Sequence, residues 1–338
     1  MSDESGPASR SDGDEELLER LAATRTALEE QVARRIVGQA EIVEKLLVAL
    51  LAGGHALVVG VPGLAKTTLI ATLAETLRLR FHRIQFTPDL MPSDITGTEV
   101  LDEDRETGRR VFRFVPGPIF ANVILADEIN RTPPKTQAAL LQAMQEGEVT
   151  AGSETYRLER PFFVLATQNP IEHEGTYPLP EAQLDRFMME LRITYPSLEE
   201  ETSIASLTTA GPPPRVDAVL DGDGLQRFQA LVRRVPAPPS VVGAAVRLAR
   251  ATRPSDPAAP RFVREMIAWG AGPRASQYLV LGAKARAALD GRAAPDFDDL
   301  RALAPDVLRH RVVPGFEAEA AGRGADDLVA ELVATMLA

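Results

Sequence analysis

The segment that most constrains this chain is G-V-P-G-L-A-K-T at residues 60–67. It follows the apolar run 56–59 and precedes a helix-forming stretch, which predicts a glycine-containing loop between a buried strand and a helix N-terminus. Backbone N–H groups of such a loop turn inward, and the helix dipole adds positive potential, so the loop suits phosphate groups. The chain is therefore expected to bind a nucleotide on an α/β fold.

Individual positions of the loop have distinct expected roles. Lys66 would reach the β- and γ-phosphates, and the Thr67 hydroxyl would ligate Mg²⁺. Ala65 stands where a glycine usually precedes the lysine. A plain connecting turn is the alternative, but a lysine at the positive end of a helix is unfavourable unless an anion neutralises it. The predicted nucleotide contacts in this segment are Gly60, Val61, Pro62, Gly63, Leu64, Ala65, Lys66, Thr67 and Thr68.

Composition limits the other classes of function. The 338 residues include 37 basic and 48 acidic side chains, a net charge of −11, which argues against a general nucleic-acid-binding surface but not against a local basic groove. The absence of cysteine excludes disulfides and thiolate chemistry, and four scattered histidines make a histidine metal cluster an unfavoured reading. No run approaches a membrane span, and residues 1–14 lack the features of a signal peptide, so we expect a cytoplasmic protein.

Strand and helix signals alternate through the first two thirds of the chain. This alternation predicts a mostly parallel sheet covered on both faces, with nucleotide at the carboxyl ends of its strands. We expect a disordered acidic tail at 1–14, an α/β core with an N-terminal helix at 15–195, and a smaller all-α domain at 196–338. Expected strands are 55–59, 83–86, 123–126, 162–167 and 189–194, and expected helices lie near 41–51, 67–79, 134–146 and 180–187.

Two segments interrupt this alternation and predict inserted β-hairpins. Residues 98–101 and 109–114 flank the polar turn 102–108, and residues 148–150 and 156–158 flank the turn 151–155. On the residues alone, surface decoration is the favoured interpretation of these hairpins.

Polar residues end two of the apolar strands. Asp127 and Glu128 follow 123–126, where Asp127 could hold Mg²⁺ and Glu128 could orient and deprotonate water. An acidic helix N-terminus is the alternative. Asn169 follows the strand at 162–167 and could bind the γ-phosphate or the lytic water, or it could simply start a turn before Pro170.

Four strings together resemble a MoxR-type AAA+ ATPase. They are the phosphate loop, L-A-D-E-I-N-R with T-P-P-K-T-Q-A-A-L-L after it, A-T-Q-N-P, and E-G-T-Y-P-L-P-E-A-Q-L-D-R-F at 174–187. The likeness runs from about residue 36 through the C-terminal helices. The resemblance implies a P-loop NTPase core with two hairpins, a helical lid domain, and a ring of subunits, usually six, with ATP bound between neighbours.

The same resemblance implies roles for particular residues. Asn169 would be the first sensor, Arg186 an arginine finger for the adjacent subunit, and Arg274 the second sensor. Val37, Gly38 and Gln39 would lie near adenine, and the hairpins would face the ring pore. Without the resemblance, Arg186 is better explained as a cation at a helix end.

Two further segments that contain arginine carry predictions of their own. Arg131 could touch nucleotide across the interface or serve in a helix cap or salt bridge. Arg309 to Arg311 are expected to contact carbonyl groups at the end of the preceding helix.

These patterns predict a Mg²⁺-dependent ATPase. The resemblance implies that it remodels or matures a protein client, with a von Willebrand factor A domain protein as a partner. One alternative is a DNA-acting motor, opposed by the acidic turn at 102–106. The other is a nucleotide-gated assembly scaffold with little turnover. No guanine-selecting motif or kinase-like arginine cluster supports a GTPase or a small-molecule kinase.

Overall fold

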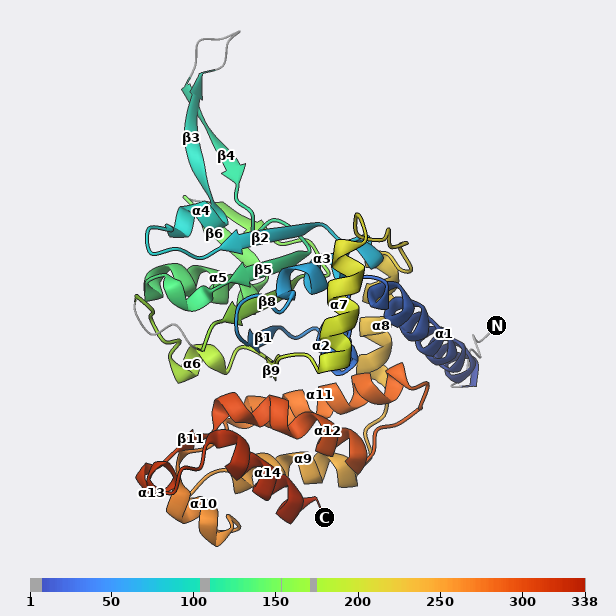
Figure 1. The fold of residues 1–338 in the computed structure, drawn as a ribbon, viewed down its shortest axis with the longest axis vertical. Coiled ribbons are helices and arrows are strands. Elements are labelled where there is room, and N and C mark those ends of the chain that lie inside the picture. Colours follow the sequence, from blue (N-terminus) through green and yellow to red (C-terminus); the bar gives the residue numbers. More distant parts are fainter. Residues whose placement is uncertain (1–7, 104–109, 153, 171–174, 338) are drawn as a thin grey trace, which may run out of the picture.

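The computed structural model describes residues 8–103, 110–152, 154–170 and 175–337 (Figure 1). Its centre is a five-stranded sheet with strand order β2-β5-β8-β1-β9. Neighbouring strands of this sheet run parallel throughout, which confirms the expected α/β architecture. The strands are β1 (Ala56–Val59), β2 (Phe81–Gln85), β5 (Val123–Asp127), β8 (Phe163–Gln168) and β9 (Met189–Arg192).

Both faces of the sheet are covered. Successive side chains of a strand point to opposite faces, so Leu125 enters the hydrophobic cluster that contains α2 and α3, while Ile124 enters the cluster that contains α5. Such two-sided burial explains why these strands read as continuous apolar runs. The core helices are α2 (Ala40–Ala52), α3 (Lys66–Thr76), α4 (Pro92–Thr96), α5 (Pro134–Glu146), α6 (Glu181–Leu184) and the 3₁₀ turn η1 (Ile129–Arg131).

Two antiparallel hairpins are inserted into the core, as expected. The first pairs β3 (Gly97–Glu103) with β4 (Arg110–Pro116) and extends far from the body (Figure 1). The second pairs β6 (Glu148–Ala151) with β7 (Glu154–Arg157). Phe114 stacks on Tyr156 with ring centroids 4.0 Å apart, so the two hairpins pack on each other at their bases. The acidic turn positions 104–106 lie outside the described residues.

Helix α1 (Ala8–Ala33) begins earlier than the sequence indicated. Residues 8–14 were expected to belong to a disordered tail, but they lie in the helix, and residues 1–7 are outside the described part. Asp14 pairs with Arg234 at 2.7 Å between Oδ1 and Nη2. This long-range ion pair forms at a segment whose local sequence carries no helical periodicity.

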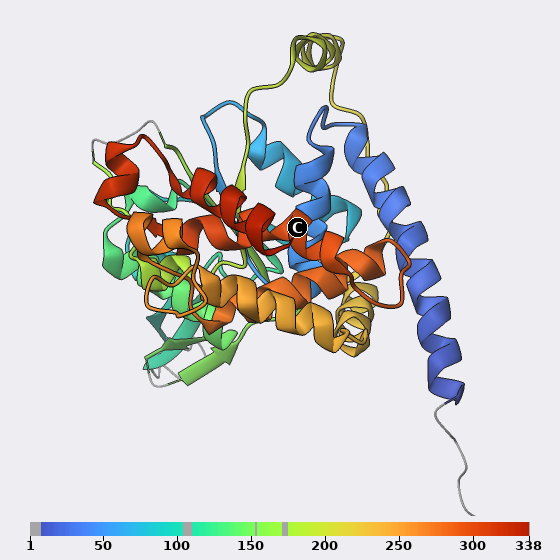
Figure 2. The ribbon, with the colours of Figure 1, turned by 90° about the horizontal axis from the view of Figure 1, so that it is seen from below.

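The C-terminal part of the chain is helical, apart from a short antiparallel pair, β10 (Ile267–Trp269) with β11 (Val313–Pro314), that was not expected. Helix α7 (Leu198–Thr209) stands apart from the other helices and has no buried residue (Figure 2). No helix in the described residues is long and apolar enough to span a membrane. The remaining elements are α8 (Gly222–Arg234), α9 (Pro239–Ala251), α10 (Arg261–Met266), α11 (Pro273–Leu289), α12 (Phe297–Leu308), η2 (Arg309–Arg311), α13 (Phe316–Ala320) and α14 (Ala325–Met336).

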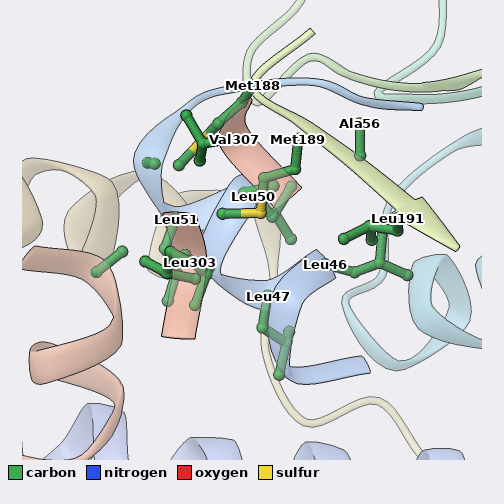
Figure 3. Packing of buried hydrophobic residues seen from close by; sticks show 14 of the residues in the cluster. Leu46, Leu47, Leu50, Leu51, Ala56, Met188, Met189, Leu191, Leu303 and Val307 are labelled. Carbon is green, nitrogen blue, oxygen red and sulfur yellow. The ribbon is translucent and has the colours of Figure 1, made fainter. Parts of the chain in front are cut away.

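The helical domain packs against β9, the edge strand of the core sheet. Met188 and Met189, at the start of β9, lie in one buried cluster with Leu50 of α2 and with Leu303 and Val307 of α12 (Figure 3). Helix α11 also contacts α1 and α2. Because core and helical domain share a continuous hydrophobic cluster, the segment that precedes β9 is held between them.

Candidate nucleotide-binding site

The phosphate loop lies between the end of β1 and the start of α3. Gly60 N–H donates to the Gln168 carbonyl at 3.2 Å, which ties the loop to the end of β8. A side chain at Gly60 would place its Cβ 2.8 Å from the Ile193 carbonyl, and Gly63 has φ 87°. Both positions therefore require glycine, one for close approach and one for its backbone conformation.

Ala65 caps the N-terminus of α3 in the left-handed conformation, with φ 54° and ψ 23°. A residue with a Cβ pays a steric penalty there, whereas glycine does not. This geometry explains why glycine is the usual residue at the position before the lysine.

We expect Ala65→Gly to raise the free energy of unfolding by about 0.5–1 kcal/mol, because relief of the left-handed strain outweighs the added entropy of the unfolded chain. Urea denaturation measures this change in the free energy of unfolding, and the m-value should be the same for both proteins. Ala71→Gly, within α3, is the matched control and should lower the free energy of unfolding by about 0.5–1 kcal/mol. Equal destabilisation by both substitutions would contradict the strain argument.

Lys66 and Thr67 begin α3 beside the two acids. Lys66 Nζ donates to the Gly60 carbonyl at 2.6 Å, within the loop itself. Burial lowers the pKa of its ammonium group, and the charges of Asp127 and Glu128 oppose that shift. The Thr67 hydroxyl makes no hydrogen bond to any described residue. The Lys66 ammonium group at the start of α3 is therefore suited to bind a phosphate. The Thr67 hydroxyl beside it is suited to bind the accompanying Mg²⁺.

Asp127 ends β5 and is buried. Its Oδ1 accepts a hydrogen bond from the Thr167 hydroxyl at 2.6 Å, and its Oδ2 pairs with Nη2 of Arg83 at 2.6 Å. Thr167 comes from β8 and Arg83 from β2, on either side of β5. The carboxylate is therefore held by both neighbouring strands at the edge where the phosphate loop lies.

Glu128 has an unusual backbone conformation, with φ 58° and ψ 49°. Non-glycine residues rarely adopt this region, and such strain concentrates at functional sites. Its N–H donates to Thr167 Oγ1 at 2.9 Å, and its Oε2 accepts from Gln85 Nε2 at 2.7 Å. Arg131 Nε lies 3.3 Å from the same oxygen. The carboxylate is thus oriented by residues of β2 and η1.

Asn169 directly follows β8 and is buried with an interaction partner. The carbonyl of the preceding Gln168 accepts the hydrogen bond from Gly60. Asn169 is therefore adjacent to the phosphate loop, as the parallel sheet predicted.

A cavity of about 520 Å³ continues from the phosphate loop towards α7. Gln39 Nε2 donates to the Leu64 carbonyl at 3.2 Å, which joins the segment before α2 to the loop. Val37, Gly38 and Gln39 line the cavity together with Ile204 and Thr208 of α7. The structure thus places the three predicted base-contacting residues beside the loop, where a nucleoside would follow its phosphates.

Arg186 and Arg274 do not lie beside this phosphate loop. Met188 N–H donates to the His55 carbonyl at 2.7 Å, so the segment 185–188 is at the amino end of β1. The phosphate loop is at the carboxyl end of the same strand, about 13 Å away at 3.3 Å per residue. Arg274 Nη1 is 3.1 Å from Asp185 Oδ2, which places it beside Arg186 rather than beside the loop.

Two family models match this chain. The model of the ATPase family associated with various cellular activities (AAA) matches residues 55–189, and the AAA lid domain matches residues 261–332. Chaperone MoxR1 of Mycobacterium tuberculosis is 44% identical over 303 residues, which cover 90% of this chain and 78% of the relative. The chain belongs to the MoxR-type AAA+ ATPases.

Two further proteins are also similar to it. Protein MoxR of Methylorubrum extorquens is 31% identical over 307 residues, covering 84% of this chain and 86% of the relative. The crystal structure of a candidate ATPase from Cytophaga hutchinsonii superposes with a TM-score of 0.88 at 39% identity, over 97% of this chain and 98% of that one. The core and the helical lid are therefore those of a MoxR-type AAA+ protein.

Three residues of this MoxR-type site were not predicted from sequence. Arg83 and Gln85 hold the two acids from β2, and Thr167 bonds to both of them from β8. The sequence does show polar residues at alternate positions of this strand, Arg83 and Gln85. Their role depended on β2 lying next to β5, which the order of elements along the chain does not reveal. The string at 174–187 begins at Glu174, which lies outside the described residues.

Proposed function

We propose that this MoxR-type protein hydrolyses ATP in a Mg²⁺-dependent reaction within an oligomer. The observation that carries the proposal is that the Lys66 ammonium group, next to Thr67, lies near the charges of Asp127 and Glu128. Residues 62–65 of the same loop line a cavity that also reaches residues 37–39. Lys66 would neutralise the β- and γ-phosphates. Glu128 would orient the attacking water and accept its proton, while Asn169 would bind that water or the γ-phosphate.

Thr67 and Asp127 are the residues that would hold Mg²⁺. Bound there with the nucleotide, the ion would neutralise charge on the phosphate oxygens. Arg83 competes for the Asp127 carboxylate at 2.6 Å. We therefore infer that the Arg83 side chain turns away, or that Asp127 acts through water, when the ion is bound.

A neighbouring subunit would complete the site. Arg186 has no hydrogen bond or ion pair to its side chain within the described residues, and it lies at the opposite end of β1 from its own phosphate loop. It also follows a helix of only four residues, too short to favour a cation strongly at its end. Both observations support a finger offered to an adjacent subunit, in a ring that we propose to be hexameric.

We propose that ATP turnover drives remodelling or maturation of a protein client in the cytoplasm. The name of the relative Chaperone MoxR1 supports a protein client. The family resemblance adds a protein with a von Willebrand factor A domain as the proposed partner.

We expect Lys66→Ala to weaken ATP binding at least about 100-fold, since a charge-assisted contact to a desolvated phosphate is lost. Titration with a fluorescent ATP analogue measures the affinity, and phosphate release measures turnover. Lys135→Ala, at the start of α5, is the control and should change neither. Tight ATP binding by Lys66→Ala would contradict the assigned site. Tight binding without turnover in the unsubstituted protein would favour the assembly scaffold.

We expect neither single- nor double-stranded DNA to bind appreciably at physiological salt or to stimulate the ATPase. The net charge is −11, and Arg113 on the long hairpin is paired with Asp102 at 3.1 Å, so its charge is partly neutralised. Fluorescence anisotropy with labelled oligonucleotides tests this. Submicromolar, steeply salt-dependent binding would favour a DNA motor instead.

A further inference from the structure

Helix α7 turns one face towards the nucleotide cavity. Glu200, Ile204 and Leu207, spaced i, i+4 and i+7, are half-buried, whereas every other residue of this helix is exposed. Glu200 and Ile204 line the cavity together with residues 37–39. Apolar residues are expected on the inward face of a surface helix. A carboxylate at this position therefore needs a reason.

Helix capping accounts for only one of the two carboxylate oxygens of Glu200. Its Oε2 accepts a hydrogen bond from the Ser197 N–H at 2.8 Å, and its own N–H donates to Ser197 Oγ at 3.2 Å, which forms a capping box. Oε1 has no hydrogen bond or ion pair within the described residues. The second oxygen can therefore accept a hydrogen bond from a ligand.

Gly38 shows where this second oxygen lies. A Cβ at Gly38 would collide with Glu200 Oε1, and Gly38 has φ 78°, so this position requires glycine on both counts. Oε1 therefore lies directly against the segment 37–39, which we propose to contact the nucleoside.

Gln39 adds a second acceptor to the same segment. Its Nε2 donates to the Leu64 carbonyl, and its Oε1 is buried without a hydrogen-bond partner within the described residues. Buried polar atoms in proteins nearly always have a partner. Two acceptors with remaining capacity at one segment indicate a ligand that donates hydrogen bonds there.

The arginines that line the cavity leave the charge of Glu200 in place. Arg35 pairs with Glu75 at 2.5 Å, and Arg192 pairs with Glu190 at 3.3 Å. Neither arginine forms an ion pair with Glu200, so the carboxylate can act on the ligand as a charged acceptor.

Adenine and guanine differ at the group that such an acceptor would meet. Adenine carries a 6-amino group, which donates hydrogen bonds, whereas guanine carries O6, which accepts them. A carboxylate accepts from the amino group and repels O6. An acceptor against the nucleoside segment therefore favours adenine.

We propose that Glu200 is a specificity-determining residue that accepts a hydrogen bond from the 6-amino group of adenine and so disfavours guanine nucleotides. The inference rests on the proposed function, because it needs a nucleotide whose phosphates lie at Lys66. It adds a base-selecting side chain on α7, outside the segment 37–39.

Glu200→Gln tests the proposal and preserves the cap. The amide oxygen can still accept from Ser197, which leaves an NH₂ donor where Oε1 lies. We expect the unsubstituted protein to prefer ATP over GTP about 10- to 100-fold, and Glu200→Gln to lose at least about 10-fold of that preference. ATP should bind more weakly and GTP more tightly. Competition against a ribose-labelled ATP analogue measures each affinity.

Purine riboside triphosphate, which has a hydrogen in place of the 6-amino group, locates the contact on the base. It should bind to Glu200→Gln and to the unsubstituted protein within about twofold, because the hydrogen bond is missing from both complexes. Weakening equal to that of ATP would show that the carboxylate acts on another part of the nucleotide, and would overturn the inference.

Two control variants separate base selection from the stability of α7. Glu199→Gln changes an exposed carboxylate of the same helix turn that does not line the cavity. Ser197→Ala removes the cap hydroxyl but keeps the Glu200 carboxylate. Both variants should keep the preference for ATP over GTP.

An unchanged ATP-to-GTP ratio in Glu200→Gln, or loss of that ratio in Ser197→Ala as well, would overturn the inference. The proposed function would stand without it if Lys66→Ala still weakened ATP binding. Tight ATP binding by both Lys66→Ala and Glu200→Gln would instead show that the nucleotide site itself is wrong.

Discussion

Replacement of Glu128 by glutamine is expected to lower kcat for ATP about 100- to 10,000-fold, the usual contribution of a general base. Glutamine keeps the size of the side chain and its hydrogen bonds but cannot accept a proton from water. Lys66 and the phosphate loop are unchanged, so ATP affinity should stay within a few-fold of the original. The effect should therefore appear in kcat and not in binding.

Steady-state phosphate release and ATP titration separate these two quantities. Glu146→Gln, at the end of α5, is a suitable control and should leave both unchanged. Undiminished turnover by Glu128→Gln would show that another group activates the water. The strained backbone and the contacts from Gln85 and Arg131 would then have a purely structural explanation.

Removal of the Arg186 guanidinium should have an effect at least as large. We expect Arg186→Ala to bind ATP nearly normally and to hydrolyse it about 1,000-fold more slowly or worse, the range for arginine fingers. The charge it stabilises develops mainly in the transition state, so the loss falls on kcat. Arg227→Ala, an exposed arginine of α8, is the control and should have no effect.

Mixing Arg186→Ala with Glu128→Gln subunits tests whether the finger acts on a neighbour. Interfaces that pair an intact Glu128 with an intact Arg186 reappear only in mixed oligomers, so the mixture should regain activity. Native mass spectrometry establishes that subunits have exchanged. Activity no higher than the sum of the two separate variants, despite exchange, would leave Arg186 with a structural role.

The sequence by itself determined the core of the site. Parallel strands end at one edge of a sheet, so Lys66 after β1, Asp127 at the end of β5 and Asn169 after β8 had to converge once each strand was recognised. Recognition was possible because both faces of these strands are buried and the strands read as apolar runs. The polar residues at the ends of these strands can therefore be identified from the sequence without knowing which strands are neighbours.

The tertiary structure alone decided which side chains support that core. Gln85 and Arg83 contact the acids because β2 lies next to β5, although the paired residues are 43 and 44 positions apart in the chain. Likewise, the ion pair of Asp14 with Arg234 joins segments with no common local signal. Contacts of this kind depend on packing between distant elements, which periodicity within one segment cannot encode.

The position of Arg274 is the clearest case. Its sequence context, a proline-started helix with an early arginine, predicted phosphate contact without stating whose phosphate. Only the docking of α11 and α12 on the start of β9 shows that this arginine lies beside Asp185 and Arg186, at the opposite end of β1 from its own phosphate loop. Local residues determined the chemistry of the arginine, and hydrophobic packing between the domains decided which edge of the subunit it occupies.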